Sequence, residues 1–565
     1  MAQYKTPDVY VVEKSTMPPS VAEVPTAIPA FIGYTATTKD TRGEDITQIP
    51  RRITSMVEYE RIFGGKYLEN FTVKQIDDSD EFVLPTVGNK ALATFYLHQA
   101  LGHFFANGGG TCYVISIGGY DTDSKNKEDF ISAIDKLNKV DEVTLIACPE
   151  SIHLNDIDHY TVQDKALAHS GKRKDRFALV DVRIDMQKNR GMRDDAAALR
   201  TGAVSDLKYG AAYYPYLRTS ISRSYDETKV TVSYRLNEQQ VHNDYTQYKN
   251  LENETVDKYG KKDNKVYAAY LSVGEKIVDA QGYVVDKTGL RLDEEPYGIF
   301  TNKEGDKYLN VNGQETTKDS NMVSDENKGI THSIPVVAKK YIASLNYLNN
   351  PMGRLSSTAV YNKVKVLLNT NYLVLPPSAA IAGVIAKTDA ERGVWKAPAN
   401  VALAMVVEPT IAIDSSEQED LNVDVTAGKS INAIRSFIGK GTLVWGARTL
   451  AGNDNEWRYV PVRRLFNMVE ESIQKSTAFA VFEPNTPFTW LKVKTMIESY
   501  LENIWQQGAL FGTSPEQAFF VNVGLGQTMT EDDINNGYMK IDIGLAAVRP
   551  AEFIVLTFTH KSLEG

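Results

Sequence analysis

Continuous apolar runs separated by amphipathic stretches characterise residues 36–221. The runs TCYVISI (111–117), VTLIACP (143–149) and FALVDVR (177–183) are apolar on both faces, which is typical of strands covered on two sides. Between the first two runs, NKEDFISAIDKLNK places Phe130, Ile131, Ile134 and Leu137 on one helical face. This alternation predicts an α/β domain with a mainly parallel sheet between layers of helices.

The segment ALATFYLHQALGHFFANGGG (91–110) predicts an apolar helix that ends at Asn107 and the three glycines after it. A dinucleotide-binding glycine motif is the alternative interpretation. It is disfavoured because the last required glycine position holds Tyr113, and because these glycines follow a helix and precede a strand, the reverse of the Rossmann order.

Residues 222–350 have a different texture, rich in Asn, Asp, Lys, Gly and Tyr. In KVTVSYRL (229–236) apolar side chains alternate with polar ones, as in a strand with one solvated face. We therefore expect a small β-rich surface domain inserted into the main fold.

Residues 351–545 predict a second core domain of mixed α and β structure. TPFTWLKVKTMIESYLENIWQQGAL is expected to form a long amphipathic helix that begins near Thr486–Pro487 and ends at Gly508. QAFFVNVG (517–524) and MKIDIGLAAV (539–548) are expected to be strands.

Two end segments, 1–35 and 546–565, predict extended arms. DVYVVEK reads as a strand, and the four prolines between 18 and 29 exclude a helix after it. The segment EFIVLTF (552–558) is apolar on both faces. Such strands need another surface to cover them, and the candidates are Val9, Tyr10, Val11, Val12, Phe553, Ile554, Val555, Leu556 and Phe558.

Composition and charge narrow the function classes. The 565-residue chain is 42% hydrophobic and carries a formal net charge of -10, which argues against a nucleic-acid partner. The first residues lack the features of a signal peptide. The most apolar run, LVLPPSAAIAGVIA, has 14 residues and two prolines, too few to span a bilayer. Cys112 and Cys148 lie in apolar runs and are expected to be buried thiols of a protein made in the cytosol.

Candidate chemistry is sparse, and we expect no catalytic, cofactor or metal site. TAGKS (426–430) resembles the end of a phosphate-binding loop, but the required first glycine is Val423, so we expect a turn followed by a helix start. His98 and His103 are five residues apart and do not share a helix face. The HLNDIDHY segment (153–160) matches no metal-binding spacing and is expected to be a polar loop.

Several long motifs carry a resemblance to a known family. They are DAERGVWKAPAN (389–400), INAIRSFIGKGTLVWGARTL (431–450), WRYVPVRRL (457–465), IWQQGALFGTSPEQAFFVNVG (504–524) and IDIGLAAVRPAEFIVLTF (541–558). Together with TPDVYVVEKSTMPPSVAEVPTAIPAFIGYT (6–35), they resemble the tail sheath proteins of contractile phage tails and related contractile injection systems. Residues 222–350 do not take part in the resemblance.

The resemblance implies a structural protein without enzymatic activity. Its subunits would stack as hexameric rings into a helical homopolymer around an inner tube protein, and the polymer would contract to drive the tube through a target envelope without nucleotide hydrolysis. It further implies baseplate and tail terminator proteins as partners. Assembly would take place in the bacterial cytoplasm, followed by residence in a virion tail or an extracellular injection particle.

The resemblance also implies roles for particular residues. The arm strands would pair within the C-terminal domains of neighbouring subunits. The helix at Trp490–Leu510 would face the tube, with Lys492 and Lys494 as candidate contacts. Two alternatives stay open at this point: an α/β nucleotide-binding enzyme, and a tail tube or baseplate structural protein.

Overall fold

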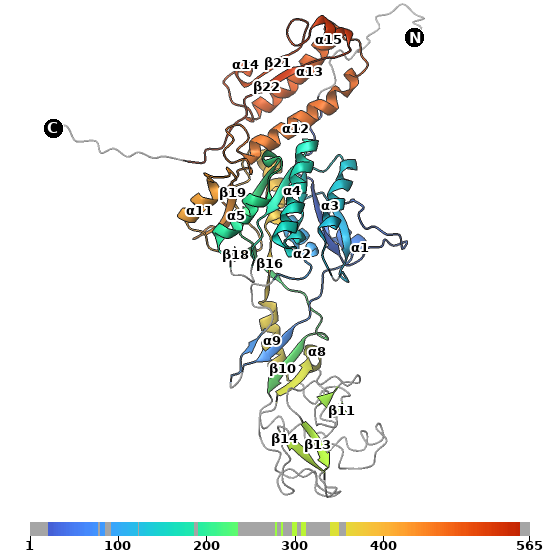
Figure 1. Cartoon of the computed structure of the whole chain (residues 1–565), viewed down its shortest axis with the longest axis vertical. Helices are drawn as coiled ribbons and strands as arrows, with labels where there is room; N and C mark the ends of the chain where they lie inside the picture. The colour runs from blue at the N-terminus through green and yellow to red at the C-terminus, as the bar shows by residue number, and fades with distance from the viewer. Residues whose placement is uncertain are drawn as a thin grey trace, which may run out of the picture. The chain divides into compact units, whose positions relative to one another are not determined.

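The computed structural model describes residues 21–76, 79–84, 92–122, 124–185, 190–235, 340–349 and 357–553, together with four short strands between 277 and 311. The chain divides into two compact units. The first comprises residues 1–65, 97–217 and 376–565, and the second comprises residues 66–96 and 218–375. Figure 1 shows the elements of each unit along the chain.

Nine of the described strands form one sheet at the centre of the first unit, in the order β17-β20-β19-β8-β7-β6-β1-β5-β2. The six strands from β19 to β5 run parallel, and antiparallel neighbours flank them at both sides. The predicted, mainly parallel sheet is therefore confirmed. Its strands are β1 (Pro29–Thr35), β2 (Arg51–Ile53), β5 (Cys112–Gly119), β6 (Leu145–Ala147), β7 (Phe177–Asp181), β8 (Gly210–Tyr214), β17 (Val401–Ala402), β19 (Ile431–Phe437) and β20 (Gly441–Val444).

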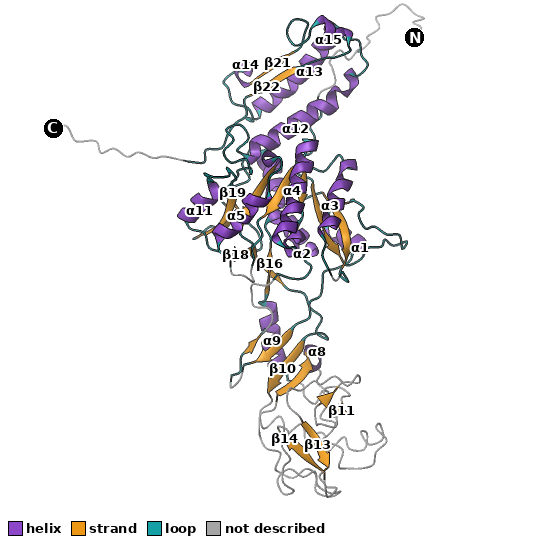
Figure 2. Ribbon diagram, viewed as in Figure 1, coloured by secondary structure: helices purple, strands orange, loops and turns teal. Residues whose placement is uncertain are grey.

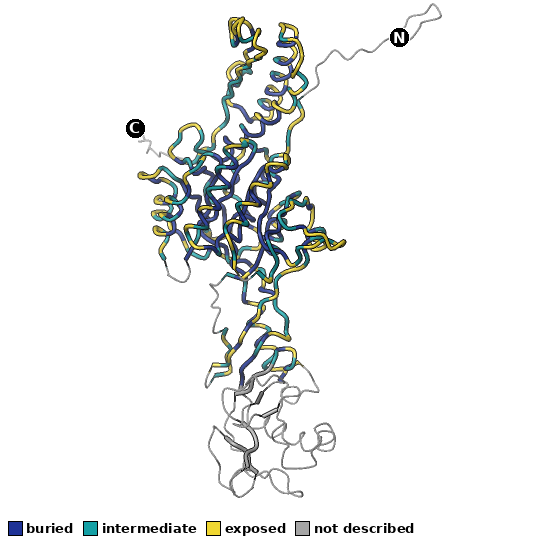
Figure 3. The backbone as a smooth tube through the Cα atoms, turned by 45° about the vertical axis from the view of Figure 1, so that its right-hand side comes forward, coloured by how far each residue is buried: buried dark blue, intermediate teal, exposed yellow. Residues whose placement is uncertain are grey.

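Helices cover both faces of this sheet (Figure 2). On one face α4 packs against α3 and α5, and on the other α2 packs against α10, as right-handed crossovers between parallel strands require. The strands between these layers are buried almost throughout (Figure 3). The helices are α2 (Leu97–Ala106), α3 (Lys127–Lys136), α4 (Asp156–Arg173), α5 (Met192–Gly202) and α10 (Ser378–Arg392), with α1 (Met56–Phe63), α11 (Ser415–Asn422) and strand β18 (Val406–Pro409) at the periphery.

The predicted stop of the apolar helix is confirmed. Helix α2 ends at Ala106, and Gly108 follows with φ 97°. A side chain is strained in this left-handed conformation, which glycine adopts freely. Both cysteines are buried free thiols, as expected.

The predicted N-terminal arm, residues 1–35, extends too far along the chain. Residues 29–35 were assigned to an extended arm, but they form a fully buried strand between β5 and β6. Pro29 is the first residue of this strand, a position where proline is tolerated. The proline-rich composition that suggested an arm therefore applies only to the residues before Pro29.

The C-terminal part of the first unit adds helices and a small sheet. Helix α12 (Val460–Ser476) and helix α13 (Pro487–Gln506) share one apolar core, against which strands β21 (Phe519–Asn522) and β22 (Asp542–Leu545) pack. The expected helix from Thr486–Pro487 to Gly508 and both expected strands are confirmed. The short helices α14 (Pro515–Ala518) and α15 (Glu531–Asn535) complete this part.

The second unit holds a four-stranded sheet in the order β15-β10-β3-β4. This unit contains more of the chain than the predicted 222–350 insert, because residues 66–96 and 351–375 belong to it as well. The expected strand in KVTVSYRL is β10. The elements are β3 (Thr72–Gln75), β4 (Phe82–Val83), β9 (Leu217–Ser222), β10 (Thr231–Arg235), β11 (Ile277–Val278), β12 (Val284–Val285), β13 (Tyr297–Thr301), β14 (Lys307–Val311), β15 (Lys340–Ser344), α8 (Leu345–Leu348), α9 (Thr358–Asn369) and β16 (Tyr372–Leu375).

A buried carboxyl group joins the sheet to α10. Asp181, the last residue of β7, accepts hydrogen bonds from the backbone N–H (2.9 Å) and the hydroxyl (2.6 Å) of Ser378, the first residue of α10. Burial raises the pKa of Asp181 to about 7, although both bonds from Ser378 lower it in part.

This raised pKa predicts a pH-dependent stability. Between pH 4 and 7 the folded protein keeps a proton on Asp181 that the unfolded chain releases, so the contribution of Asp181 to stability falls as the pH rises. An Asp181→Asn variant cannot ionise. We expect its free energy of unfolding, relative to wild type, to increase by about 1–3 kcal/mol between pH 5 and pH 8, measured by urea denaturation. The exposed-site variant Asp532→Asn is the control, and a pH-independent difference between wild type and Asp181→Asn would contradict the expectation.

Candidate functional site: the C-terminal strand pair and the exits of the two arms

Strands β21 and β22 form an antiparallel pair, with Phe519 opposite Leu545 and Asn522 opposite Asp542. In the described part of the chain this sheet has two strands, so each strand has one edge without a strand partner. One face of the pair, including Val521, packs on the core shared by α12 and α13. An open strand edge supported from one side is suited to accept a strand from another chain.

Apolar side chains are exposed around this pair. Phe520 on β21 is 54% exposed and Phe511, in the preceding loop, is 74% exposed. Across from Phe520 lies Gly544, where an added Cβ would come within 2.2 Å of the Phe520 ring. The ring therefore lies over the backbone of β22 rather than over a side chain, and its other face remains uncovered.

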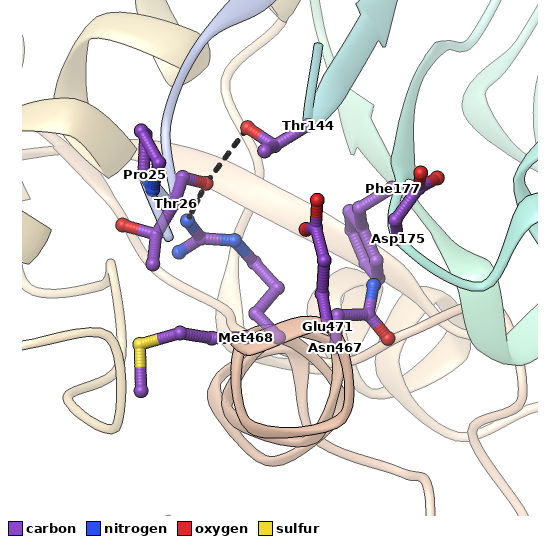
Figure 4. Close-up of a pocket in the computed structure, with 9 residues that line it drawn as sticks. Pro25, Thr26, Thr144, Asp175, Phe177, Asn467, Met468 and Glu471 are labelled. Atoms are coloured by element: carbon purple, nitrogen blue, oxygen red, sulfur yellow. Dashed lines mark hydrogen bonds between the residues drawn. The ribbon is translucent and has the colours of Figure 1, made fainter. Parts of the chain in front are cut away.

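The N-terminal segment is held in place from residue 21 onward. Val21 and Val24 pack against the core of α12 and α13, and the backbone N–H of Val24 donates to the Ser472 hydroxyl at 3.1 Å. Two residues further on, the Thr26 carbonyl accepts from the Thr144 hydroxyl at 2.9 Å and from the Arg464 guanidinium at 2.8 Å (Figure 4).

A buried ion pair fixes this exit. Arg464 on α12 pairs with Asp389 on α10, through Nη1–Oδ1 at 2.8 Å and a second, shorter contact. Their side chains are 3% and 7% exposed, and the Thr26 hydroxyl donates to Asp389 Oδ2 at 2.6 Å. The adjacent cavity in Figure 4 has a volume of about 10 Å³, room for no more than about one water molecule. The arrangement holds the chain rather than a ligand.

A second ion pair fixes the exit of the C-terminal segment. Arg448 donates to both carboxylate oxygens of Glu552, with Nε 2.9 Å from Oε1 and 3.1 Å from Oε2, and Nη2 2.7 Å from Oε2. Asn422 Nδ2 donates to Oε1 at 3.0 Å, and the Tyr459 hydroxyl donates to Oε2 at 3.2 Å. Burial alone would raise the pKa of Glu552, but the bonds from Arg448 and Asn422 outweigh this and hold the pKa below its ordinary value of 4.5.

Most predicted arm residues lie outside the described residues. This is so for Val9, Tyr10, Val11 and Val12 at one end and for Ile554, Val555, Leu556 and Phe558 at the other. Phe553 is described: it follows Glu552 directly and is 71% exposed. The strand expected at 553–558 therefore stays a prediction.

The candidate tube contacts lie on α13. Lys492 is exposed, with its ammonium 4.6 Å from the centre of the Phe479 ring. Lys494 is half-buried and lies 3.6 Å from Glu498, one helical turn further along. The structure places both on one helix but does not test their contact with a tube.

The TAGKS turn does not form a phosphate-binding loop. The backbone N–H groups of Thr426, Ala427 and Lys429 donate to the Asp424 carboxylate at 3.1 to 3.3 Å, so the chain's own carboxylate occupies the position of an anion. Lys429 Nζ donates to the Arg200 carbonyl at 2.5 Å. The predicted helix start is wrong, because strand β19 follows the turn. β-Branched residues and buried neighbours favour a strand there.

The predicted polar loop at 153–160 is also wrong, because helix α4 begins inside it. Asn155 caps this helix by accepting from the N–H of Asp158. Asp156 pairs with Arg183 at 2.7 Å and with Arg190 at 2.5 Å, and Asp158 pairs with Lys127 at 2.6 Å.

His98 and His103 lie in different environments. His98 contacts Glu60 at 2.8 Å, whereas His103 is buried and contacts the Ala404 carbonyl at 2.9 Å. Within the described ranges there is no cluster of three or more residues able to hold a metal ion. In the same part of the chain, none of the helices has the length and apolar character needed to cross a membrane.

Sequence reasoning missed the two ion pairs. Arg464 and Asp389 are 75 residues apart, and Arg448 and Glu552 are 104 apart. A single sequence carries no signal for such distant pairs. The one hint was local: a charged residue, Glu552, immediately before an apolar run.

Family models match two adjacent parts of the chain. Residues 337–450 match the phage tail sheath protein central domain, and residues 452–561 match the phage tail sheath C-terminal domain. The tail sheath protein of Vibrio phage KVP40 is 26% identical over 199 residues, which cover 34% of this chain. The match spans 27% of the length of that relative.

Solved structures match almost the whole chain. The sheath complex of the PVC extracellular contractile injection system in the contracted state is 26% identical, with a TM-score of 0.55 and coverage of 99% of both chains. The helical sheath of the anti-feeding prophage in its contracted state is also 26% identical, with a TM-score of 0.54 over 99% of this chain and 100% of that chain. Residues 337–561 thus match the central and C-terminal domains of phage tail sheath proteins, and almost the full chain is similar to the subunits of contracted contractile sheaths.

Proposed function

We propose that the protein is the structural subunit of a contractile sheath, which polymerises helically around an inner tube and contracts to drive the tube through a target envelope. The observation that carries the proposal is the open β21–β22 pair in a chain whose full length resembles subunits of contracted sheaths. In the assembly, subunits stack as hexameric rings. Baseplate and tail terminator proteins bound the polymer at its ends.

Neighbouring subunits are linked by strand exchange. The N-terminal strand (Val9–Val12) and the C-terminal strand (Phe553–Phe558) add to the β21–β22 pairs of neighbouring copies through backbone hydrogen bonds. A contact of this head-to-tail kind does not close on itself and builds a helical polymer. Burial of four large apolar side chains gives roughly 6–12 kcal/mol per strand before the cost of ordering, enough to keep the link while other contacts rearrange.

Contraction uses energy stored at assembly, and the chain has no enzymatic role. The TAGKS turn is filled by Asp424, which argues against nucleotide binding there and against the enzyme alternative. The full-length likeness to subunits of contracted sheaths favours a sheath subunit over a tail tube protein. Assembly takes place in the bacterial cytoplasm, and the finished sheath belongs to a virion tail or an extracellular particle. The 222–350 region is dispensable for polymerisation.

Electron microscopy of the purified protein tests the proposal. Hollow cylinders with regular striations are expected. A protein that remains monomeric, or that forms closed rings stabilised by nucleotide, would contradict it.

The strand-exchange step predicts the effect of arm deletion. Removal of residues 1–14 or of residues 554–565 takes away one donor strand and leaves Glu552 with its partners. Both variants are expected to stay folded, with a melting temperature close to that of wild type, and to lose polymerisation. The measurements are sedimentation velocity for assembly and circular dichroism for folding. Normal cylinders from either variant would contradict strand exchange.

The tube contact predicts a charge effect on α13. Lys492→Glu together with Lys494→Glu is expected to weaken co-assembly with the tube protein about tenfold or more, measured by co-sedimentation. Since Lys494 lies beside Glu498, the reversal also adds a repulsion of about 0.5 kcal/mol within the helix, too small to unfold the protein. The matched control is Lys440→Glu on the exposed β19–β20 turn. Equal co-assembly of the test and control variants would exclude this part of α13 as the tube contact.

A further inference from the structure

Two consecutive residues near the end of the described chain, Glu552 and Phe553, have opposite environments. The Glu552 carboxylate accepts hydrogen bonds from Arg448, Asn422 and Tyr459, whereas the Phe553 side chain is 71% exposed. Bidentate bonding between a guanidinium and a carboxylate fixes both position and direction. The chain therefore leaves the folded body at a defined point and in a defined direction.

The hydrogen bonds continue from Glu552 into the central sheet. The Arg448 backbone N–H donates to Asn432 Oδ1 at 2.8 Å, and Asn432 Nδ2 donates to the Arg448 carbonyl at 2.8 Å. Asn432 lies on β19 and its Nδ2 also donates to the Ala212 carbonyl of β8 at 3.1 Å. A force applied to Glu552 would therefore be transmitted through Arg448 to the neighbouring strands β19 and β8.

The N-terminal exit has the same construction. The Arg464–Asp389 pair holds Thr26, and two residues later the Ile28 N–H donates to the Thr144 hydroxyl at 2.9 Å. Strand β1 begins at Pro29, between β5 and β6. A force applied to the N-terminal segment would be transmitted into the middle of the same sheet.

Helix α12 connects the two exits. Tyr459, its N-cap residue, donates to Glu552, and Arg464, five positions further along, binds the Thr26 carbonyl. Five residues of helix rise roughly 7 Å, so the two anchor points are close together on one element. The opposite end of α12 carries Ser472, which accepts from Val24, and its apolar face belongs to the core beneath β21 and β22.

We propose that Glu552 and α12 form an anchor that positions the C-terminal arm and passes its load into the central sheet. The inference rests on the proposed strand exchange and adds the residues that make an exchanged strand effective. An arm that starts from a fixed point loses less conformational freedom when it enters a neighbouring sheet. Without the anchor, the same strand can still pair, but at a greater cost in entropy.

A spin label on the monomer tests the anchor without any polymer. Because Cys112 and Cys148 are buried, an Ala551→Cys substitution gives one selective labelling site next to Glu552. Glu552→Ala in this background is expected to increase the label mobility about twofold. Tyr459→Phe, which removes one of the hydrogen bonds, is expected to have a smaller effect in the same direction and also serves if Glu552→Ala folds poorly. Glu531→Ala, at an exposed position on α15, should leave the mobility unchanged. Equal mobility in all three variants would overturn the anchor.

Polymerisation of the full-length chain then separates the anchor from the exchange itself. Glu552→Ala is expected to raise the critical concentration for assembly about tenfold relative to Glu531→Ala, while deletion of residues 554–565 abolishes assembly. If deletion abolishes assembly but Glu552→Ala assembles as the control does, the anchor is wrong and strand exchange stands. If the deletion variant also assembles normally, the proposed strand exchange is wrong, and the anchor falls with it.

Discussion

The buried ion pair between Arg464 and Asp389 is the interaction on which the first unit depends most. It joins α12 to α10, and both side chains bind Thr26, just before the chain enters β1. Two charges removed from water persist only when their hydrogen-bonding groups are satisfied, and loss of one partner of such a pair typically costs about 3–5 kcal/mol. The pair therefore fixes helix, sheet and exit path together.

Because these elements are held rigidly, the open strand pair β21–β22 can stay ordered. An isolated two-stranded sheet is marginal in water, and an exposed edge invites unwanted pairing. Here the core of α12 and α13 supports β21 and β22 from one side, so the pair stays ordered without a third strand. Phe520, exposed over Gly544, leaves an apolar surface that an incoming strand would cover.

The sequence predicted the elements whose signals are local. Continuous apolar runs predicted β5, β6 and β7. Helical periodicity predicted α3 and α13, and an apolar run that stops at glycines predicted α2. Strand β1 was misassigned because the prolines before it dominate the composition of the segment, although Pro29 only begins the strand. The start of α4 was missed because Asn155, Asp156 and Asp158 suit both a polar loop and a helix N-terminus.

The candidate site was harder to predict than the fold, for a physical reason. An added strand is recognised largely through backbone hydrogen bonds, so many apolar sequences can serve, and the pattern in EFIVLTF suffices to suggest one. The anchor requires particular side chains, Arg448 and Glu552, brought together from positions 104 residues apart. In the proposed strand exchange, the direction of the arm is set by residues without a local sequence pattern, while the affinity comes from a segment with an obvious one. This division explains why the arm strands could be predicted from the sequence, whereas the groups proposed to orient the C-terminal arm were found only in the structure.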